Sequence, residues 1–173
     1  MMSASPVDQL IEYMRMLDMT KRTMYTKATL VHTLESFLLD HGRQWTPARR
    51  PRGLRKQPDK LCFMNSQRHV LTHQQLCGDD DLEALWYCEG FALGVIPIHH
   101  AWLVDRSGTV LDLTWDEPDK ATYWGVAFNT SYLRTKVIET ERWLSLLDNY
   151  EQGWPLLRGI DGVQEAVVKW RGL

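Results

Sequence analysis

The sequence predicts an α+β protein whose helices pack on an antiparallel β-sheet. Apolar residues recur at helical spacing through most of the first 77 residues, and the pattern changes to strand-like runs between residues 82 and 115. Helical segments with Gly and Pro breaks follow. The order of helices, then strands, then helices is typical of the α+β class. A chain of 173 residues can bury a proper core, so we expect a single domain over residues 1–173.

Two helices are expected at the start of the chain. Ser5 and Pro6 form a cap and first-turn signature, and apolar residues follow at helical spacing. A second helix is predicted over roughly residues 22–41, and Gly42 is expected to end it in the left-handed conformation. Both are interpreted as packing helices.

Residues 43–60, RQWTPARRPRGLRKQPDK, form a basic segment with three prolines and seven Lys or Arg against one acidic residue. The prolines predict that it forms no regular element. It is either a solvated loop or a basic flap beside an anionic substrate or an acidic partner. The net charge of the chain is −2 and no nucleic-acid-binding motif accompanies the cations, so we expect no nucleic-acid partner.

The rest of the chain is predicted as one more helix, a set of strands and two further helices. The helix begins after Asp59 as N-cap and ends at Gly78. The strand-like runs are LEALWYCEGFALG (82–94), PIHHAWLVD (97–105), GTVLDLTW (108–115) and YWGVAF (123–128). Helices are expected near residues 139–150 and 161–170.

No apolar run approaches the roughly 20 residues that cross a bilayer. The first residues also lack the basic and then apolar pattern of a signal peptide. We therefore expect a cytoplasmic protein with no membrane partner. Cys62, Cys77 and Cys88 are an odd number without a close CxxC pair, so free thiols are expected rather than a disulfide framework.

Cys62 is the best placed of the three cysteines to act as a nucleophile. It falls in the first turn of the helix after Asp59, where unpaired backbone N–H groups and the helix dipole favour a thiolate. The basic segment before it adds positive potential. Cys77 would lie at the negative end of the same helix. Cys88 would lie in a strand beside the carboxylate of Glu89, which disfavours a thiolate, and it is kept as the alternative nucleophile.

His100 and Asp112 are predicted to meet on one face of the hairpin formed by residues 97–115. A nucleophilic cysteine needs a base that a third group holds in place. If residues 106–108 form a three-residue loop with its glycine in the left-handed conformation, the register makes these two residues diagonal neighbours within hydrogen-bonding reach. A two-residue loop would place them on opposite faces. His99 points away from Asp112 in either case.

Four further residues are expected at the substrate. Glu89 interrupts an apolar strand, where a buried carboxylate is costly unless it is paired. It is expected either to contact the substrate or a loop arginine, or to face water at a sheet edge. For an oxyanion, the backbone N–H of Cys62 is the first donor, and Gln57 or Trp45 is a candidate second donor. Trp102 is expected to line the same site.

A cysteine at a helix start, followed by strands with HAW and D-x-T, resembles the transglutaminase-like group of the papain-like cysteine fold. The resemblance implies that Cys62 attacks an acyl carbon, His100 acts as the base and Asp112 on the adjacent strand orients His100. Lys60 and Leu61 stand where that group often has a GxC motif. The string YCEGFA resembles that motif at Cys88, which supports the alternative nucleophile.

The blocks CFMNS, YCEGFALG, HHAWLVD, VLDLTW and YWGVAF are also similar to a set of small uncharacterised phage and bacterial proteins. Those proteins carry CFxNA, YxEGxA, HAW, DxTW and YFG blocks. The resemblance covers roughly residues 60–128. It implies a shared site but names no substrate. If the protein is phage-encoded, we expect it to act on a host target in the host cytoplasm.

These observations predict a cysteine-dependent acyl hydrolase or transferase of the amidase, deamidase, protease or transglutaminase type. Its substrate would be a protein or a small acyl compound, and no cofactor or metal is expected. One alternative is a zinc site built from Cys62, His69, His73 and Cys77, whose offsets of 7, 4 and 4 bring the last three near one helix face. Another is a binding or inhibitor protein that uses the basic segment and its tryptophans without catalysis.

Overall fold

The computed structural model describes residues 4–24, 30–77 and 84–170, and it leaves the side chains of residues 24 and 74–77 undescribed. Within this part the chain is α+β, with five α-helices, five strands and a short 3₁₀ helix at Pro118–Lys120. The helices are α1 (Pro6–Met24), α2 (Leu34–His41), α3 (Cys62–Cys77), α4 (Thr130–Thr140) and α5 (Val163–Ala166). The strands are β1 (Arg43–Trp45), β2 (Trp86–Leu93), β3 (Pro97–Val104), β4 (Val110–Leu111) and β5 (Thr122–Phe128).

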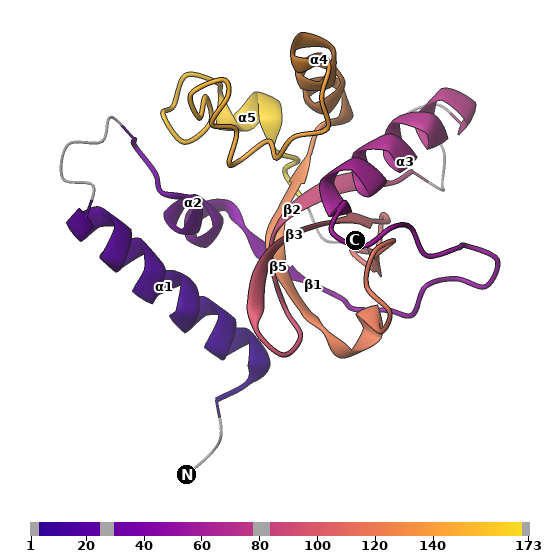
Figure 1. Ribbon diagram of the computed structural model, residues 1–173, viewed down its shortest axis with the longest axis horizontal. Coiled ribbons are helices and arrows are strands. Elements are labelled where there is room, and N and C mark those ends of the chain that lie inside the picture. Colours follow the sequence, from indigo (N-terminus) through magenta and orange to yellow (C-terminus); the bar gives the residue numbers. More distant parts are fainter. Residues whose placement is uncertain (1–3, 25–29, 78–83, 171–173) are drawn as a thin grey trace.

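All five strands belong to one antiparallel sheet in the order β1-β5-β2-β3-β4. The sheet curls strongly; in the view of Figure 1, α1 and α2 lie to its left, α3 to its right, and α4 and α5 above it, and residues of α1 to α4 share one buried cluster with one face of the sheet. Side chains alternate between the two faces of the sheet along each strand, and both faces carry buried residues. The face toward the helices carries Tyr87, Phe91, Leu103 and Phe128.

The inner face of the curled sheet holds a cluster of aromatic residues. Trp45, Trp102 and Tyr123 are buried there, and Trp86, Trp115 and Trp170 pack against them. Gly125 makes room for the Trp102 ring, which a Cβ at this position would meet at 2.8 Å. The same Cβ would meet the Glu89 carbonyl oxygen of the neighbouring strand at 2.2 Å. Trp102 Nε1 is buried without a hydrogen-bond partner among the described residues.

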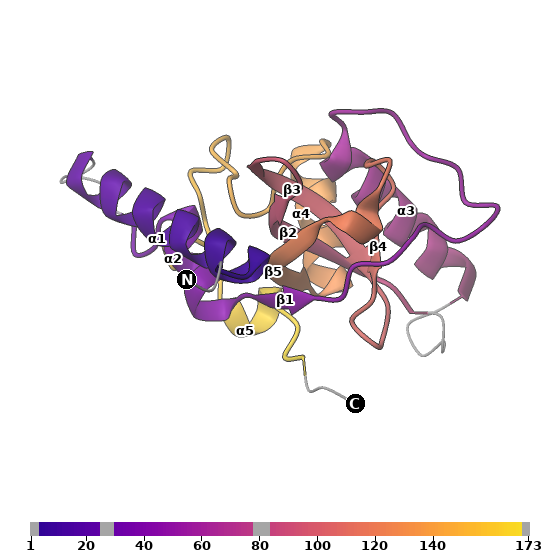
Figure 2. The same ribbon diagram turned by 90° about the horizontal axis from the view of Figure 1, so that it is seen from below.

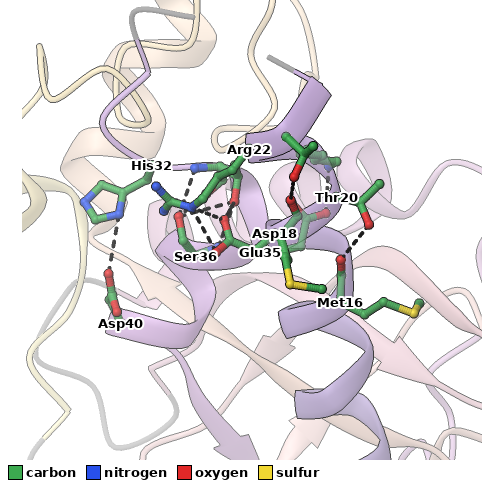
Figure 3. A network of polar contacts seen from close by, with 12 residues as sticks. Met16, Asp18, Thr20, Arg22, His32, Glu35, Ser36 and Asp40 are labelled. Carbon is green, nitrogen blue, oxygen red and sulfur yellow. Dashed lines mark hydrogen bonds and ion pairs between the residues drawn. The ribbon is translucent and has the colours of Figure 1, made fainter. Parts of the chain in front are cut away.

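The second helix is shorter than the predicted span of 22–41: residues 22–24 belong to α1, residues 25–29 lie outside the described ranges, and residues 30–33 are not helical. It begins at Leu34 because Thr33 caps it: Thr33 Oγ1 accepts from the Ser36 N–H at 3.0 Å, and Ser36 Oγ accepts from the Thr33 N–H at 2.9 Å. Thr33 also donates to Asp18 of α1, and Lys21 pairs with the buried Glu35 at 2.7 Å, so α1 and α2 are joined by the polar network in Figure 3.

The predicted left-handed stop at Gly42 is wrong, because this glycine has extended backbone, with φ −80° and ψ 166°. A different constraint operates at this position. A Cβ on Gly42 would meet the Leu38 carbonyl oxygen at 2.3 Å and Trp124 Nε1 at 2.7 Å. Trp124 Nε1 donates to that same carbonyl at 2.9 Å, so the glycine leaves room for the contact between α2 and β5.

Four further segments differ from the prediction. Residues 43–45 of the basic segment form the edge strand β1, whereas none was expected there. The run 108–115 supplies only the two-residue strand β4. In place of a helix at 139–150, α4 ends at Thr140, and the predicted helix at 161–170 is reduced to Val163–Ala166.

The helix predicted at 139–150 is absent because local side chains and Glu89 take the backbone N–H groups that a helix would use. The Asp148 N–H donates to Ser145 Oγ at 2.8 Å, and the Leu147 N–H donates to Glu89 at 3.1 Å. Glu141 adopts the left-handed conformation and ends α4. The segment that follows is therefore irregular, although Leu146 and Leu147 are buried.

Candidate active site

Helix α3 begins with Cys62 itself. The Leu61 carbonyl accepts from the Asn65 N–H at 2.8 Å, which makes Leu61 the N-cap and Cys62 the first helical residue. The prediction that Asp59 caps this helix is wrong. Its carboxylate instead pairs with Lys56 at 2.8 Å, and the left-handed Lys60 (φ 63°) turns the chain before the helix starts.

Asn65, which the sequence prediction missed, joins the start of α3 to the hairpin. Its buried side-chain amide donates to the Pro58 carbonyl at 2.8 Å and to Thr114 Oγ1 at 3.1 Å. Asn65 lies one helical turn after Cys62, and Thr114 lies two residues after Asp112. The sequence signal that could have identified it is a polar Asn three residues after the candidate nucleophile, on the same face of the predicted helix.

The predicted register of the hairpin is confirmed. Gly108 is left-handed at φ 80°, and β3 and β4 pair Leu103 with Leu111 and Val104 with Val110. His100 and Asp112 meet as expected, with His100 Nε2 at 2.8 Å from Asp112 Oδ2. Because β4 stops at Leu111, the outer edge of the first half of β3 is left open to the segment that carries Asp112.

Asp112 has its two carboxylate oxygens fully engaged. Oδ1 accepts from the backbone N–H groups of Thr114 at 2.7 Å and Trp115 at 3.1 Å, and Oδ2 accepts from Tyr123 Oη at 2.9 Å as well as from His100. The side chain is fully buried. Burial opposes ionisation, but the hydrogen bonds from His100 and the two N–H groups lower the pKa of Asp112 below its usual value.

His100 lies between Asp112 and Cys62 and is only 2 % exposed. Its ring stacks on Trp115 with centroids 4.8 Å apart. Burial lowers the pKa of His100, but hydrogen bonds with Asp112 and Cys62 and their negative charges outweigh it and raise the pKa to about 9. Since Asp112 occupies Nε2, Nδ1 is the ring nitrogen left to face the Cys62 thiol.

The raised pKa of His100 gives the stability of the protein a defined pH dependence. Between pH 6.5, the ordinary value, and about 9, the folded state holds a proton that the unfolded state has lost. The stabilisation by this contact is therefore complete below pH 6.5. It decreases by at most about 1.4 kcal/mol per pH unit toward pH 9. Denaturant unfolding at pH 6.5 and 9.5 should show this decrease in the native protein and not in His100→Gln; an equal pH dependence in both would contradict it.

Cys88 has surroundings unsuited to a nucleophile. It lies in the centre of the sheet on the inner face, paired with Trp102 and Ala127, and it is fully buried. Burial and the negative charge of Glu89 raise the pKa of the Cys88 thiol well above its usual value. These surroundings favour Cys62 over Cys88 as the nucleophile.

Glu89 does not face water at a sheet edge, which was one of the two alternatives expected from the sequence. It is fully buried in β2, which is an interior strand rather than an edge. Oε1 accepts from Tyr87 Oη at 2.6 Å and from the Leu146 N–H, and Oε2 accepts from Ser145 Oγ at 2.7 Å and the Leu147 N–H at 3.1 Å. Glu89 therefore holds the irregular segment after α4 against the sheet.

The other predicted substrate residues lie in different environments. Trp102 is fully buried against Tyr123, with centroids 5.0 Å apart. Trp45 is almost as buried and donates through Nε1 to the Gly125 carbonyl at 3.0 Å. Gln57 is exposed five residues before Cys62, and its backbone N–H donates to the Leu113 carbonyl at 2.7 Å. Of the three, only Gln57 has an exposed side chain.

The segment between β1 and α3 is tied to the chain around Asp112. Arg50 donates to the carbonyls of Asp112 and Trp115, Arg49 pairs with Asp119 at 2.8 Å, and Lys56 pairs with Asp116 at 2.9 Å. Figure 2 shows the segment extending beyond β4 before it returns to α3. Part of its positive charge is thus balanced within the protein, while Arg52, Arg55 and Lys60 are exposed.

The residues of the alternative zinc site do not come together in the part of the chain that is described. His69 and His73 stack on α3 with centroids 6.3 Å apart, whereas Cys62 faces His100. Cys77 ends the helix, and its side chain is outside the described residues. No group of three or more His, Cys, Asp or Glu side chains among those described is placed to hold a metal ion.

Comparisons of the chain with family models, curated proteins and solved structures gave no match. None of the helices within the described ranges is long and apolar enough to cross a bilayer. The case for a function therefore depends on the geometry of the site.

Proposed function

We propose that this protein is a cysteine-dependent acyl hydrolase or transferase with Cys62, His100 and Asp112 as its triad, on a fold of the transglutaminase-like or papain-like type. The observation that carries the proposal is the chain of contacts from Asp112 through His100 to Cys62 at the first position of a helix. Nucleophile, base and orienting carboxylate in that order are the arrangement that activates a thiol for acyl transfer.

Each residue has a defined part in the proposed reaction. Cys62 gives its proton to His100, and the thiolate attacks the acyl carbon, so that a C–S bond forms and the carbonyl oxygen becomes an oxyanion. The tetrahedral intermediate collapses, the bond to the leaving amine or alcohol breaks, and His100 donates its proton to the leaving group. Water or an amine then attacks the thioester and gives a proton to His100. Cys62 leaves as the thiolate.

The oxyanion would be stabilised at the start of α3. The Cys62 N–H at the first helical position has no acceptor within the helix and lies at the positive end of the helix dipole. The exposed amide of Gln57, whose backbone N–H donates to the Leu113 carbonyl beside Asp112, would supply the second donor by turning from its 3.4 Å contact with the Arg55 carbonyl. A backbone donor and a side-chain amide together are a common composition for this kind of site.

Cysteine alkylation tests the proposal without knowledge of the substrate. At pH 6, iodoacetamide should modify Cys62 at least ~100-fold faster than a free thiol of ordinary pKa, of which under about 1 % is thiolate. Peptide mass spectrometry would assign the modified residue. Cys88→Ala should keep the rapid modification and Cys62→Ala should lose it. A rate at Cys62 equal to that of a free thiol would refute the proposal.

A second function, binding without catalysis, is favoured by how little of the site is accessible. Cys62 is 8 % exposed and Asp112 not at all, while Arg52, Arg55 and Lys60 present positive charge to solvent. In this case the protein would bind an acidic surface on a partner, and the resemblance to phage proteins suggests one in a host cytoplasm. Slow alkylation of Cys62, together with salt-sensitive binding that Arg52→Glu abolishes, would support this function instead.

A further inference from the structure

A cavity of about 250 Å³ lies beside the start of α3. Phe63 and His99 form one wall, and their rings meet edge to face with centroids 5.2 Å apart. The irregular segment after α4 forms the opposite wall through Trp143, Asp148 and Tyr150. Phe63 directly follows Cys62 and packs against the buried cluster that contains Cys62, so the cavity lies beside the proposed nucleophile, whereas the neighbouring His100 points to the other face of β3.

Two buried polar side chains hold the wall formed by the irregular segment after α4 in place. Gln67 of α3 donates to the Leu144 carbonyl at 2.6 Å, and Glu89 accepts from Ser145 Oγ and from the next two backbone N–H groups. Burying a carboxylate and an amide costs free energy unless each forms several hydrogen bonds. Here their bonds order a segment without regular structure. The wall is therefore pre-formed, as in binding sites built on irregular chain.

The chemistry of the walls selects the occupant. The rings of Phe63, Trp143 and Tyr150 provide faces for a cation, and the exposed Asp148 provides a carboxylate. Trp154 Nε1 donates to Asp148 Oδ1 at 2.8 Å, which orients the carboxylate and leaves Oδ2 for another donor. Among the described residues that line the cavity there is no Lys or Arg.

We infer that this cavity is a specificity subsite for a lysine or arginine side chain of the substrate. The methylene stem would pack between the rings while the charged head lies at Asp148. The cavity has room for one such side chain. This inference rests on the proposed function and names its substrate class: a peptide acyl group close to a basic residue. Glu89 and Gln67 are positioning residues for the subsite.

Three chloroacetamides of equal length, which end in an ammonium, a methyl group or a carboxylate, would test the subsite. The Cys62 thiolate attacks the CH₂ carbon, a C–S bond forms and chloride leaves. Saturation kinetics separates the concentration for half-maximal rate from the maximal rate. The ammonium reagent should reach half-maximal rate at a concentration about tenfold below that of the methyl reagent. Equal values, or a preference for the carboxylate reagent, would overturn the inference.

Asp148→Asn provides the matched variant, because Asn keeps the acceptor for Trp154 and removes only the charge. It should reduce the preference for the ammonium reagent to less than about twofold. Glu165→Gln removes the same charge from the exposed surface of α5 and should leave the preference intact. Equal loss in both variants would show a general charge effect and would contradict the subsite.

A binding experiment separates this inference from the proposed reaction. If no reagent modifies Cys62 faster than a free thiol, the proposed function fails, and the subsite is then tested alone. Nα-acetyl-lysine methylamide, whose side-chain ammonium is free, should shift the Trp143 indole N–H resonance of the Cys62→Ser protein. Nα-acetyl-norleucine methylamide should need an at least about tenfold higher concentration for the half-maximal shift. Equal shifts, or none, would overturn the subsite whatever the reactivity of Cys62.

Discussion

Replacing Asp112 with asparagine should slow the alkylation of Cys62 at pH 6 by about two orders of magnitude or more. Asp112 Oδ1 accepts from two backbone N–H groups, so an asparagine oxygen would stay there and its NH₂ group would face His100. His100 Nε2 would then have to accept rather than donate. The proton would move to Nδ1, where the ring can no longer take a proton from Cys62.

Tyr123→Phe is the matched control for this prediction. It removes one hydrogen bond to the same carboxylate oxygen, at 2.9 Å, but leaves the His100 contact in place. We expect it to slow alkylation by less than about tenfold, the equivalent of one hydrogen bond of roughly 1 kcal/mol. The modification rate at Cys62 is measured for both variants by peptide mass spectrometry. If Asp112→Asn is modified as fast as the native protein, Asp112 does not determine which ring nitrogen of His100 carries the proton.

Replacing Glu89 with glutamine should lower the free energy of unfolding by about 3 kcal/mol. Each oxygen of Glu89 accepts from one hydroxyl and one backbone N–H, and the side chain is fully buried. Glutamine turns one of those acceptors into a donor. Tyr87 or Ser145 can rotate its hydroxyl, but the N–H of Leu146 or Leu147 cannot move, and it is left buried without a partner. Denaturant unfolding measures the loss.

Glu35→Gln is the control, since Glu35 is as buried as Glu89 but has a single ion pair, with Lys21, in the network between α1 and α2 (Figure 3). Native-state hydrogen exchange should show faster exchange at Leu146 and Leu147 in Glu89→Gln and unchanged exchange at these amides in Glu35→Gln. The preference for the ammonium reagent should also fall only in Glu89→Gln. Unchanged exchange at both amides in Glu89→Gln would show that Glu89 does not hold this segment.

The contact between His100 and Asp112 could be predicted from the sequence because it is local. Turn geometry and the two-residue period of a strand determine which side chains of a short hairpin share a face. A left-handed Gly108 was enough to place them. The position of Cys62 in the first turn of a helix was also predictable, although the capping residue was not, since Lys60 turns the chain between Asp59 and the helix.

The bonds that hold the triad together could not be read from the sequence. Tyr123 reaches Asp112 from β5, and Asn65 reaches Thr114 across 49 positions of the chain. Such contacts depend on how the sheet curls and where α3 packs, which no local pattern encodes. The same holds for the failed helix prediction at 139–150, where Glu89 of β2 engages a backbone N–H that helical spacing had assigned to a helix.

The sequence by itself therefore determined the α+β class, the register of the hairpin and the pairing of His100 with Asp112. Periodicity and turn chemistry act over a few residues and are written in neighbouring positions. Only the tertiary structure decided the role of Glu89. Its partners at Ser145, Leu146 and Leu147 lie 56 to 58 positions away, and they come within reach only when the segment after α4 folds back onto the buried face of β2.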